Sequence, residues 1–105
     1  MTELDQVLAA LADPTRREIV RMLTAGPRSA GTLNESFDIS APALSRHLKI
    51  LRRSGLVMDE RTEADNRVRL YALQPQSLQP IQQWLRELEA GWQDQLAAFK
   101  KHAEK

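Results

Sequence analysis

The sequence contains no cysteine among its 105 residues. This absence excludes disulfides, thiolate metal sites and cysteine nucleophiles. Histidine is scarce as well, since His47 and His102 are the only two, and the chain has neither a glycine-rich phosphate loop nor a paired-carboxylate motif. Because catalysis near neutral pH most often uses histidine as its base, the sequence indicates that the chain is not an enzyme.

Long apolar runs are also missing. No stretch approaches the roughly 18 apolar residues that a membrane-spanning helix requires, and the first six residues are too polar for a secretory signal. With 42% hydrophobic and 28% charged residues, the composition is that of a folded domain. We therefore expect one domain over residues 1–105 that is cytoplasmic and has no membrane partner.

The net charge is only +1, but its distribution is uneven. Residues 40–54 contain the basic side chains Arg46, Lys49, Arg52 and Arg53 and no carboxylate. A basic stretch on an otherwise slightly acidic body is typical of a surface that binds an anion such as nucleic acid. Charge alone leaves open the alternative of a solvated helix face without acids.

Hydrophobic spacing predicts three helices in residues 1–38. Apolar residues at i, i+3, i+4 and i+7 indicate a first helix at the N-terminal end. Asp13 followed by Pro14 is typical of the start of a second helix, which should stop near residues 25–27. Ser29 is expected to cap a short third helix.

The fourth predicted helix covers residues 40–54. Ser40 is its expected cap, Gly55 ends it, and its leucines form a stripe toward the core. A short helix, a tight turn and a second helix that is basic on its outer face together indicate a helix-turn-helix.

Residues 56–73 predict a β-hairpin that follows the basic helix in the position of a wing. Val68, Leu70 and Ala72 alternate with polar or aromatic neighbours, which is typical of a half-buried strand, and residues 63–66 are turn-forming. A last helix over 77–100, capped by Ser77, completes the chain. The predicted fold is mainly α with a β-hairpin wing, a winged helix-turn-helix in the order α-α-α-α-β-β-α.

The last helix carries an apolar stripe at alternating spacings of three and four residues. A domain this small cannot cover so long a stripe, so we expect a homodimer interface made with the first helix; packing within the domain is the alternative. The predicted interface residues are Leu4, Val7, Leu8, Leu11, Leu78, Ile81, Leu85, Leu88, Trp92 and Phe99. A small-molecule effector between protomers has no support in the sequence, and Trp84 or Trp92 fluorescence would report one.

The outer face of the fourth helix is expected to enter the major groove of double-stranded DNA. Arg46 can form a fork to guanine, Ser45 can bond a base edge, and lysine or arginine further along suits phosphate. His47 lies beside the leucine stripe, which favours a packed, hydrogen-bonded side chain over a base reader. The predicted DNA contacts are Ala41, Pro42, Ser45, Arg46, His47, Lys49, Arg53 and, at the tip of the wing, Arg67.

The role of the wing stays open at this point. Arg61, Arg67 and Arg69 are suited to phosphates or the minor groove, but acidic residues outnumber them and would repel phosphate. These acids are Asp59, Glu60, Glu63 and Asp65.

Three motifs carry a family resemblance: LADPTRR at residues 11–17, SRHLKIL at 45–51 and GLV at 55–57. With them the sequence resembles the ArsR/SmtB-type winged helix-turn-helix transcriptional repressors over nearly its whole length. It is most similar to the metal-independent branch of the sporulation-delay autorepressors. The resemblance implies a dimer joined by the first and last helices, repression by occupation of a promoter, and Ser45, Arg46 and His47 at the DNA surface, with His47 on a phosphate.

Two departures from the family pattern matter. Many members carry a polar residue, often glutamine, where this chain has Ala41, so one expected base contact is missing. Metal-sensing members have a Cys-x-Cys pair in the third helix or carboxylates and histidines in the last. Here residues 32–37 contain no sulfur, and the candidates in the last helix, Asp94 and His102, lie eight residues apart, so we expect no metal and no cofactor.

The sequence therefore predicts a homodimeric repressor that binds double-stranded DNA at an inverted-repeat operator. The alternative is a protein-interaction adaptor or antitoxin-like module, in which the basic helix would contact an acidic protein.

Overall fold

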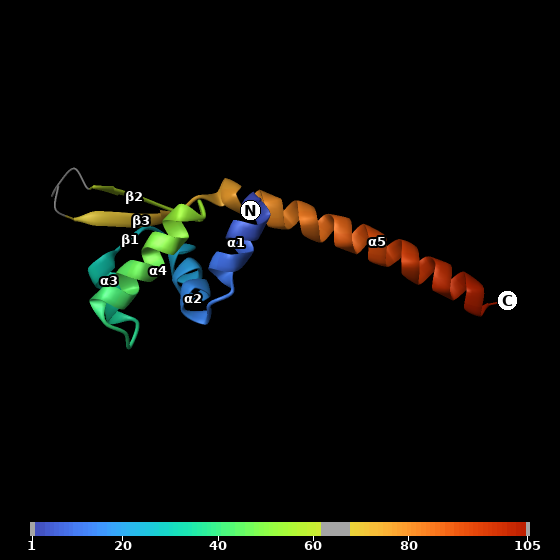
Figure 1. Cartoon of the computed structure of the whole chain (residues 1–105), viewed down its shortest axis with the longest axis horizontal. Helices are drawn as coiled ribbons and strands as arrows, with labels where there is room; N and C mark the ends of the chain where they lie inside the picture. The colour runs from blue at the N-terminus through green and yellow to red at the C-terminus, as the bar shows by residue number, and fades with distance from the viewer. Residues whose placement is uncertain (1, 62–67, 105) are drawn as a thin grey trace.

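The computed structural model describes residues 2–61 and 68–104 (Figure 1). It confirms a mainly helical winged helix-turn-helix, with one strand and one short helix beyond the predicted elements. In chain order these are α1 (Glu3–Leu11), α2 (Pro14–Leu23), β1 (Arg28–Ser29), α3 (Ala30–Glu35), α4 (Ala41–Arg53), β2 (Val57–Arg61), β3 (Arg69–Leu73), the 3-10 helix η1 (Pro75–Leu78) and α5 (Gln79–Ala103).

Short polar side chains begin α2, α3 and α4. Asp13 accepts the backbone N–H of Arg16 at 3.0 Å, and Ser29 and Ser40 each accept a backbone N–H three residues on at 3.2 Å. Each bond satisfies an amide that has no partner within its helix. These three caps lie where the sequence places them.

The prediction that Ser77 caps the last helix is wrong. Ser77 lies inside η1, and its hydroxyl donates to the Gln74 carbonyl at 2.5 Å. The α5 helix begins two residues later without a side-chain cap, with Pro80 in its first turn. The Ser77 hydroxyl therefore bonds the N-cap residue of η1 and does not cap α5.

The core lies among α1, α2, α3, α4 and the start of the hairpin. The leucine stripe of α4 faces it as predicted, and Gly55 ends that helix with a φ of +83°. The buried side chains are Val7, Ala10, Ile19, Leu23, Leu33, Leu44, Leu48, Leu51, Leu56 and Val57. This packing fixes which face of α4 remains outside.

The sheet has three antiparallel strands in the order β1-β3-β2. The two-residue strand β1 was not predicted, because so short a segment has no periodicity. Residues 70–73 of β3 are half-buried, but the alternation did not identify the residues on the core: Tyr71 and Leu73 pack there, whereas Val68 is 37% exposed. Buried Val57 pairs with Leu73, and this register directs the odd-numbered residues inward. Residues 63–66 lie outside the described residues.

Helix α5 begins against α1 and then extends away from the body, so that the molecule is 69 Å long and 27 Å across (Figure 1). Leu85, Leu88, Trp92 and Phe99 are 45%, 50%, 67% and 69% exposed. Within the described residues, no helix is both long and apolar enough to cross a membrane.

Part of the predicted dimer interface belongs to the core of the protomer. Val7 is 2% exposed and packs within its own chain, which leaves little of its side chain for a partner, so its place in the interface stays a prediction. Leu11, Leu78 and Ile81 are half-buried and pack against the same core. Leu4 and Leu8 are also half-buried.

Candidate nucleic-acid interface

Helix α4 has one buried and one exposed face. Leu44, Leu48 and Leu51 are buried, and the predicted DNA contacts Ala41, Pro42, Ser45, Arg46, Lys49 and Arg53 are all exposed. The helix contains no acidic residue. Its outer face is therefore convex, basic and free of carboxylates of its own, which suits insertion into a groove of DNA.

The cations of this face differ in what they contact. Arg52 pairs with Asp59 at 3.2 Å. Among the described residues, neither Arg46, Lys49 nor Arg53 has an ion-pair or hydrogen-bond partner for its side chain. A phosphate or a base edge can bind these three without displacing an internal contact.

The edges of the exposed face border shallow grooves. Ala41 and Ser45 line one of about 300 Å³ between α3 and α4, where the facing side is formed by small residues including Ala30 and Gly31. Lys49 lines another, of about 550 Å³, beside Met58 and Asp59 of β2. Ser45 therefore lies toward α3 and Lys49 toward the wing.

His47 lies at the border of the buried face, 22% exposed, as a packed and hydrogen-bonded side chain. Its Nδ1 is 3.3 Å from Nη1 of Arg16 and 4.0 Å from Oδ2 of Asp13, both on the α2 side. The hydrogen bond from the backbone N–H of Arg16 holds the pKa of Asp13 below its usual value. Sequence reasoning missed Arg16, because nothing local indicates a contact with a residue 31 positions away.

The wing is tied to α4 by one carboxylate. Asp59, which is 18% exposed, accepts from Arg52 at 3.2 Å and from Arg69 at 3.1 Å. It lies on the inward side of β2 because it pairs with Tyr71. One of the four acidic side chains of the wing is therefore paired with arginines of the same chain. Arg67 lies outside the described residues, so its contact with DNA stays a prediction.

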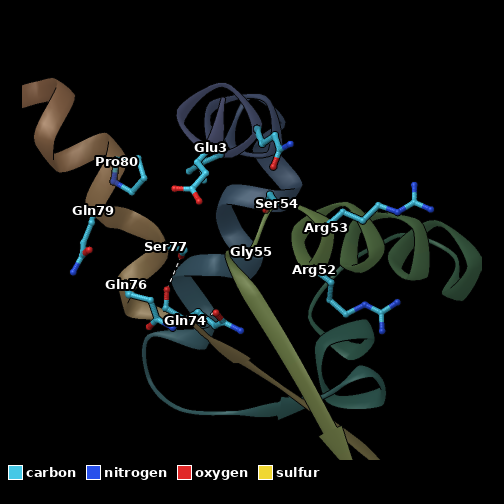
Figure 2. A pocket seen from close by; sticks show the side chains of 12 residues that line it. Glu3, Arg52, Arg53, Ser54, Gly55, Gln74, Gln76, Ser77, Gln79 and Pro80 are labelled. Carbon is cyan, nitrogen blue, oxygen red and sulfur yellow. Dashed lines mark hydrogen bonds between the residues drawn. The ribbon is translucent and has the colours of Figure 1, made fainter. Parts of the chain in front are cut away.

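A polar cavity of about 430 Å³ lies where α1, the end of α4, η1 and the start of α5 meet (Figure 2). Figure 2 shows Arg52 and Arg53 pointing away from α5, so neither guanidinium is directed at Gln79 or Glu3. No described polar or charged residue is buried, and no three described His, Asp or Glu residues gather as metal ligands. The cavity therefore offers no built site for a charged ligand or a metal.

Sequence comparison identifies relatives across the site. A family model described as a helix-turn-helix domain matches residues 11–60. The arsenical resistance operon repressor of Staphylococcus xylosus is 37% identical over 81 residues, 77% of this chain and 75% of that protein. Transcriptional repressor SdpR of Bacillus subtilis is 41% identical over 58 residues, 55% of this chain and 64% of that protein. HTH-type transcriptional regulator Rv2034 of Mycobacterium tuberculosis is 45% identical over 74 residues, 70% of this chain and 66% of that protein. The chain thus spans just under two thirds of SdpR and of Rv2034.

Solved structures extend the match to the whole fold. An ArsR family transcriptional regulator aligns with a TM-score of 0.80 and 30% identity over 88% of this chain and 98% of that chain. An ArsR-like transcriptional regulator from Rhodococcus sp. RHA1 aligns with a TM-score of 0.79 and 33% identity over 94% and 91%. The chain belongs to the ArsR/SmtB-type family of winged helix-turn-helix transcriptional repressors.

Proposed function

We propose that this DNA-binding repressor acts as a homodimer, occupies an inverted-repeat operator and needs no metal ion. The observation that carries the proposal is the exposed face of α4, where Arg46, Lys49 and Arg53 have no described partner and no carboxylate shares the helix. Arg46 and Ser45 bond base edges in the major groove, and Lys49 and Arg53 bond phosphates. A dimer on a promoter blocks access of the polymerase.

The exposed stripe of α5 supports the dimer. Leu88, Trp92 and Phe99 are each at least half exposed within one chain, and a second copy offers an identical apolar stripe that can cover them around a twofold axis. Two α4 helices related by that axis would meet successive major grooves about 34 Å apart, which requires an inverted repeat.

The composition of the chain supports independence from metal. Thiolate ligands are absent because the sequence has no cysteine. The described Asp94 and His102 of α5 belong to no cluster of three ligand-type side chains, and two isolated donors are too few for a transition-metal site. The proposal therefore predicts that added zinc and a chelator leave DNA affinity unchanged.

A charge comparison tests the role of α4. The DNA for this test is the set of genomic duplexes that the purified wild-type protein retains in a selection. We expect Arg46→Ala to weaken binding to them by about 1–3 kcal/mol, which is at least fivefold. The matched control is Arg21→Ala on α2, because Arg21 has a side chain that is 75% exposed and, among the described residues, pairs only with Glu18. Equal affinities of the two variants would contradict the assignment of α4 as the reading helix.

A further inference from the structure

We infer that Arg16 is a positioning residue of the DNA site, which orients His47 so that its Nδ1 accepts a hydrogen bond and its Nε2–H is presented to a DNA phosphate. The inference rests on the proposed function, in which the outer side of α4 meets DNA. It adds a residue of α2 that does not itself face the DNA groove.

The end of α1 fixes the Arg16 side chain. Nε of Arg16 donates to the Ala10 carbonyl at 2.6 Å and Nη2 donates to the Ala9 carbonyl at 3.3 Å. The backbone N–H of the same residue donates to Asp13 at 3.0 Å. With these atoms engaged, the remaining nitrogen Nη1 points to Nδ1 of His47 at 3.3 Å.

The chemistry of the two groups determines where the proton lies. A guanidinium has only donors and stays protonated in proteins, so Nδ1 of His47 accepts from Arg16. In a neutral imidazole the proton is then on Nε2. This nitrogen has no hydrogen-bond partner among the described residues, and the His47 side chain is 22% exposed.

A surface N–H next to Arg46 on α4 is a suitable donor to a phosphate oxygen. In the neutral ring Nδ1 accepts from Arg16. The proton on Nε2 is then available to a ligand outside the protein.

Four single variants and one double variant test the inference by their affinity for a random-sequence duplex at low salt, because a phosphate contact needs no operator. His47→Asn keeps an acceptor near the position of Nδ1 but loses the outer donor, so we expect affinity to fall about tenfold. His47→Gln places an amide N–H near the position of Nε2 and should recover much of the loss. Arg16→Met should lose affinity in the wild-type background but little more in the His47→Asn background.

The matched control is Arg17→Met. Arg17 also bonds the end of α1, donating to the Leu11 carbonyl at 2.8 Å and the Ala12 carbonyl at 3.2 Å, but among the described residues its side chain has no hydrogen bond or ion pair with α4. We expect it to lower thermal stability as Arg16→Met does while leaving DNA affinity within about twofold of wild type.

Nitrogen NMR of the His47 ring in the free wild-type protein gives a further readout. It needs no DNA, and it does not depend on whether the variants fold. We expect the neutral ring to be the Nε2–H tautomer, and the Nδ1–H tautomer would overturn the inference. Additive losses for Arg16→Met and His47→Asn, or equal affinities of His47→Asn and His47→Gln, would overturn it too. Failure of the wild-type protein to bind any duplex would instead contradict the proposed function.

Discussion

At the scale of single residues, Asp13 joins the start of α2 to the side of α4. Its Oδ2 accepts the backbone N–H of Arg16 at 3.0 Å and lies 4.0 Å from Nδ1 of His47. We expect Asp13→Ala to lower the free energy of unfolding by about 1 kcal/mol at neutral pH, because the cap is lost. Asp13→Asn should cost less, since asparagine caps about as well. Urea denaturation of the three proteins measures the difference, and an unchanged Asp13→Ala protein would contradict it.

The same carboxylate predicts a pH dependence. The hydrogen bond from the backbone N–H of Arg16 lowers the pKa of Asp13 in the folded protein. A lowered pKa stabilises the fold above the unfolded-state value of about 3.9, and this contribution disappears as the pH falls through the folded-state pKa. The stability advantage of wild type over Asp13→Asn should therefore shrink below about pH 4. An advantage that grows in acid would show that the sign is wrong.

A substitution at Gly55 tests the cost of its backbone conformation without a change in packing. Its φ is +83° and an added Cβ would meet no atom within 4 Å, so only the conformation opposes a side chain. We expect Gly55→Ala to lower stability by about 1–2 kcal/mol. Gly31→Ala is the control, since Gly31 lies in α3 without a positive φ and its Cβ would make an ordinary contact of 3.9 Å with Ser29. The comparison fails if thermal denaturation shows both variants equally stable.

At the scale of secondary-structure elements, the sequence predicted what local patterns determine. Helix α4, its Ser40 cap and its buried leucines follow from spacing and capping within 15 residues of chain. The face of β3 did not, because Val57 and its pairing with Leu73 decide it across the hairpin. The burial of Val7 within its own core was not predicted for a similar reason: spacing places an apolar residue on one face of α1 but does not say what covers that face.

The same distinction explains which parts of the site were predicted. The exposed cations of α4 follow from the helical period alone. The Arg16–His47 contact and the Arg52–Asp59–Arg69 cluster depend on tertiary packing, because each joins elements that are separate in the chain. Sequence reasoning predicted the exposed basic face of α4 but not the contacts that hold the side chains around it.

Helix α5 carries the prediction for assembly. Trp92→Glu places a charge in the middle of the exposed stripe, where Trp92 is 67% exposed within one chain. We expect the variant to be monomeric with the winged domain still folded, because the buried core does not include Trp92. Sedimentation and circular dichroism measure the two properties.

Ala90→Glu is the matched control for this helix. Residue 90 is exposed and lies on the opposite side of α5 from Trp92 at about 100° per residue. This control should remain dimeric. A wild-type protein that sediments as a monomer, or a dimer that survives Trp92→Glu, would contradict the proposed interface.

At the scale of the whole molecule, the winged domain carries both the basic face of α4 and the start of α5. Because α5 begins against α1 and projects away from the body, pairing of two such helices in the proposed dimer would set the separation of two α4 helices (Figure 1). DNA affinity should therefore depend on dimerisation, and log affinity should fall with log salt by about 0.9 per phosphate neutralised. Affinity that does not change with salt would contradict binding through Lys49 and Arg53.

The most direct test of the central claim is selection of fragmented genomic DNA from the source organism by the purified protein, followed by sequencing of what is retained. The account predicts enrichment of an inverted repeat whose half-sites lie about one helical turn apart, with the enrichment lost in Arg46→Ala. Retention of no duplex at low salt, or enrichment of unpaired half-sites only, would contradict a homodimeric repressor that reads DNA through α4.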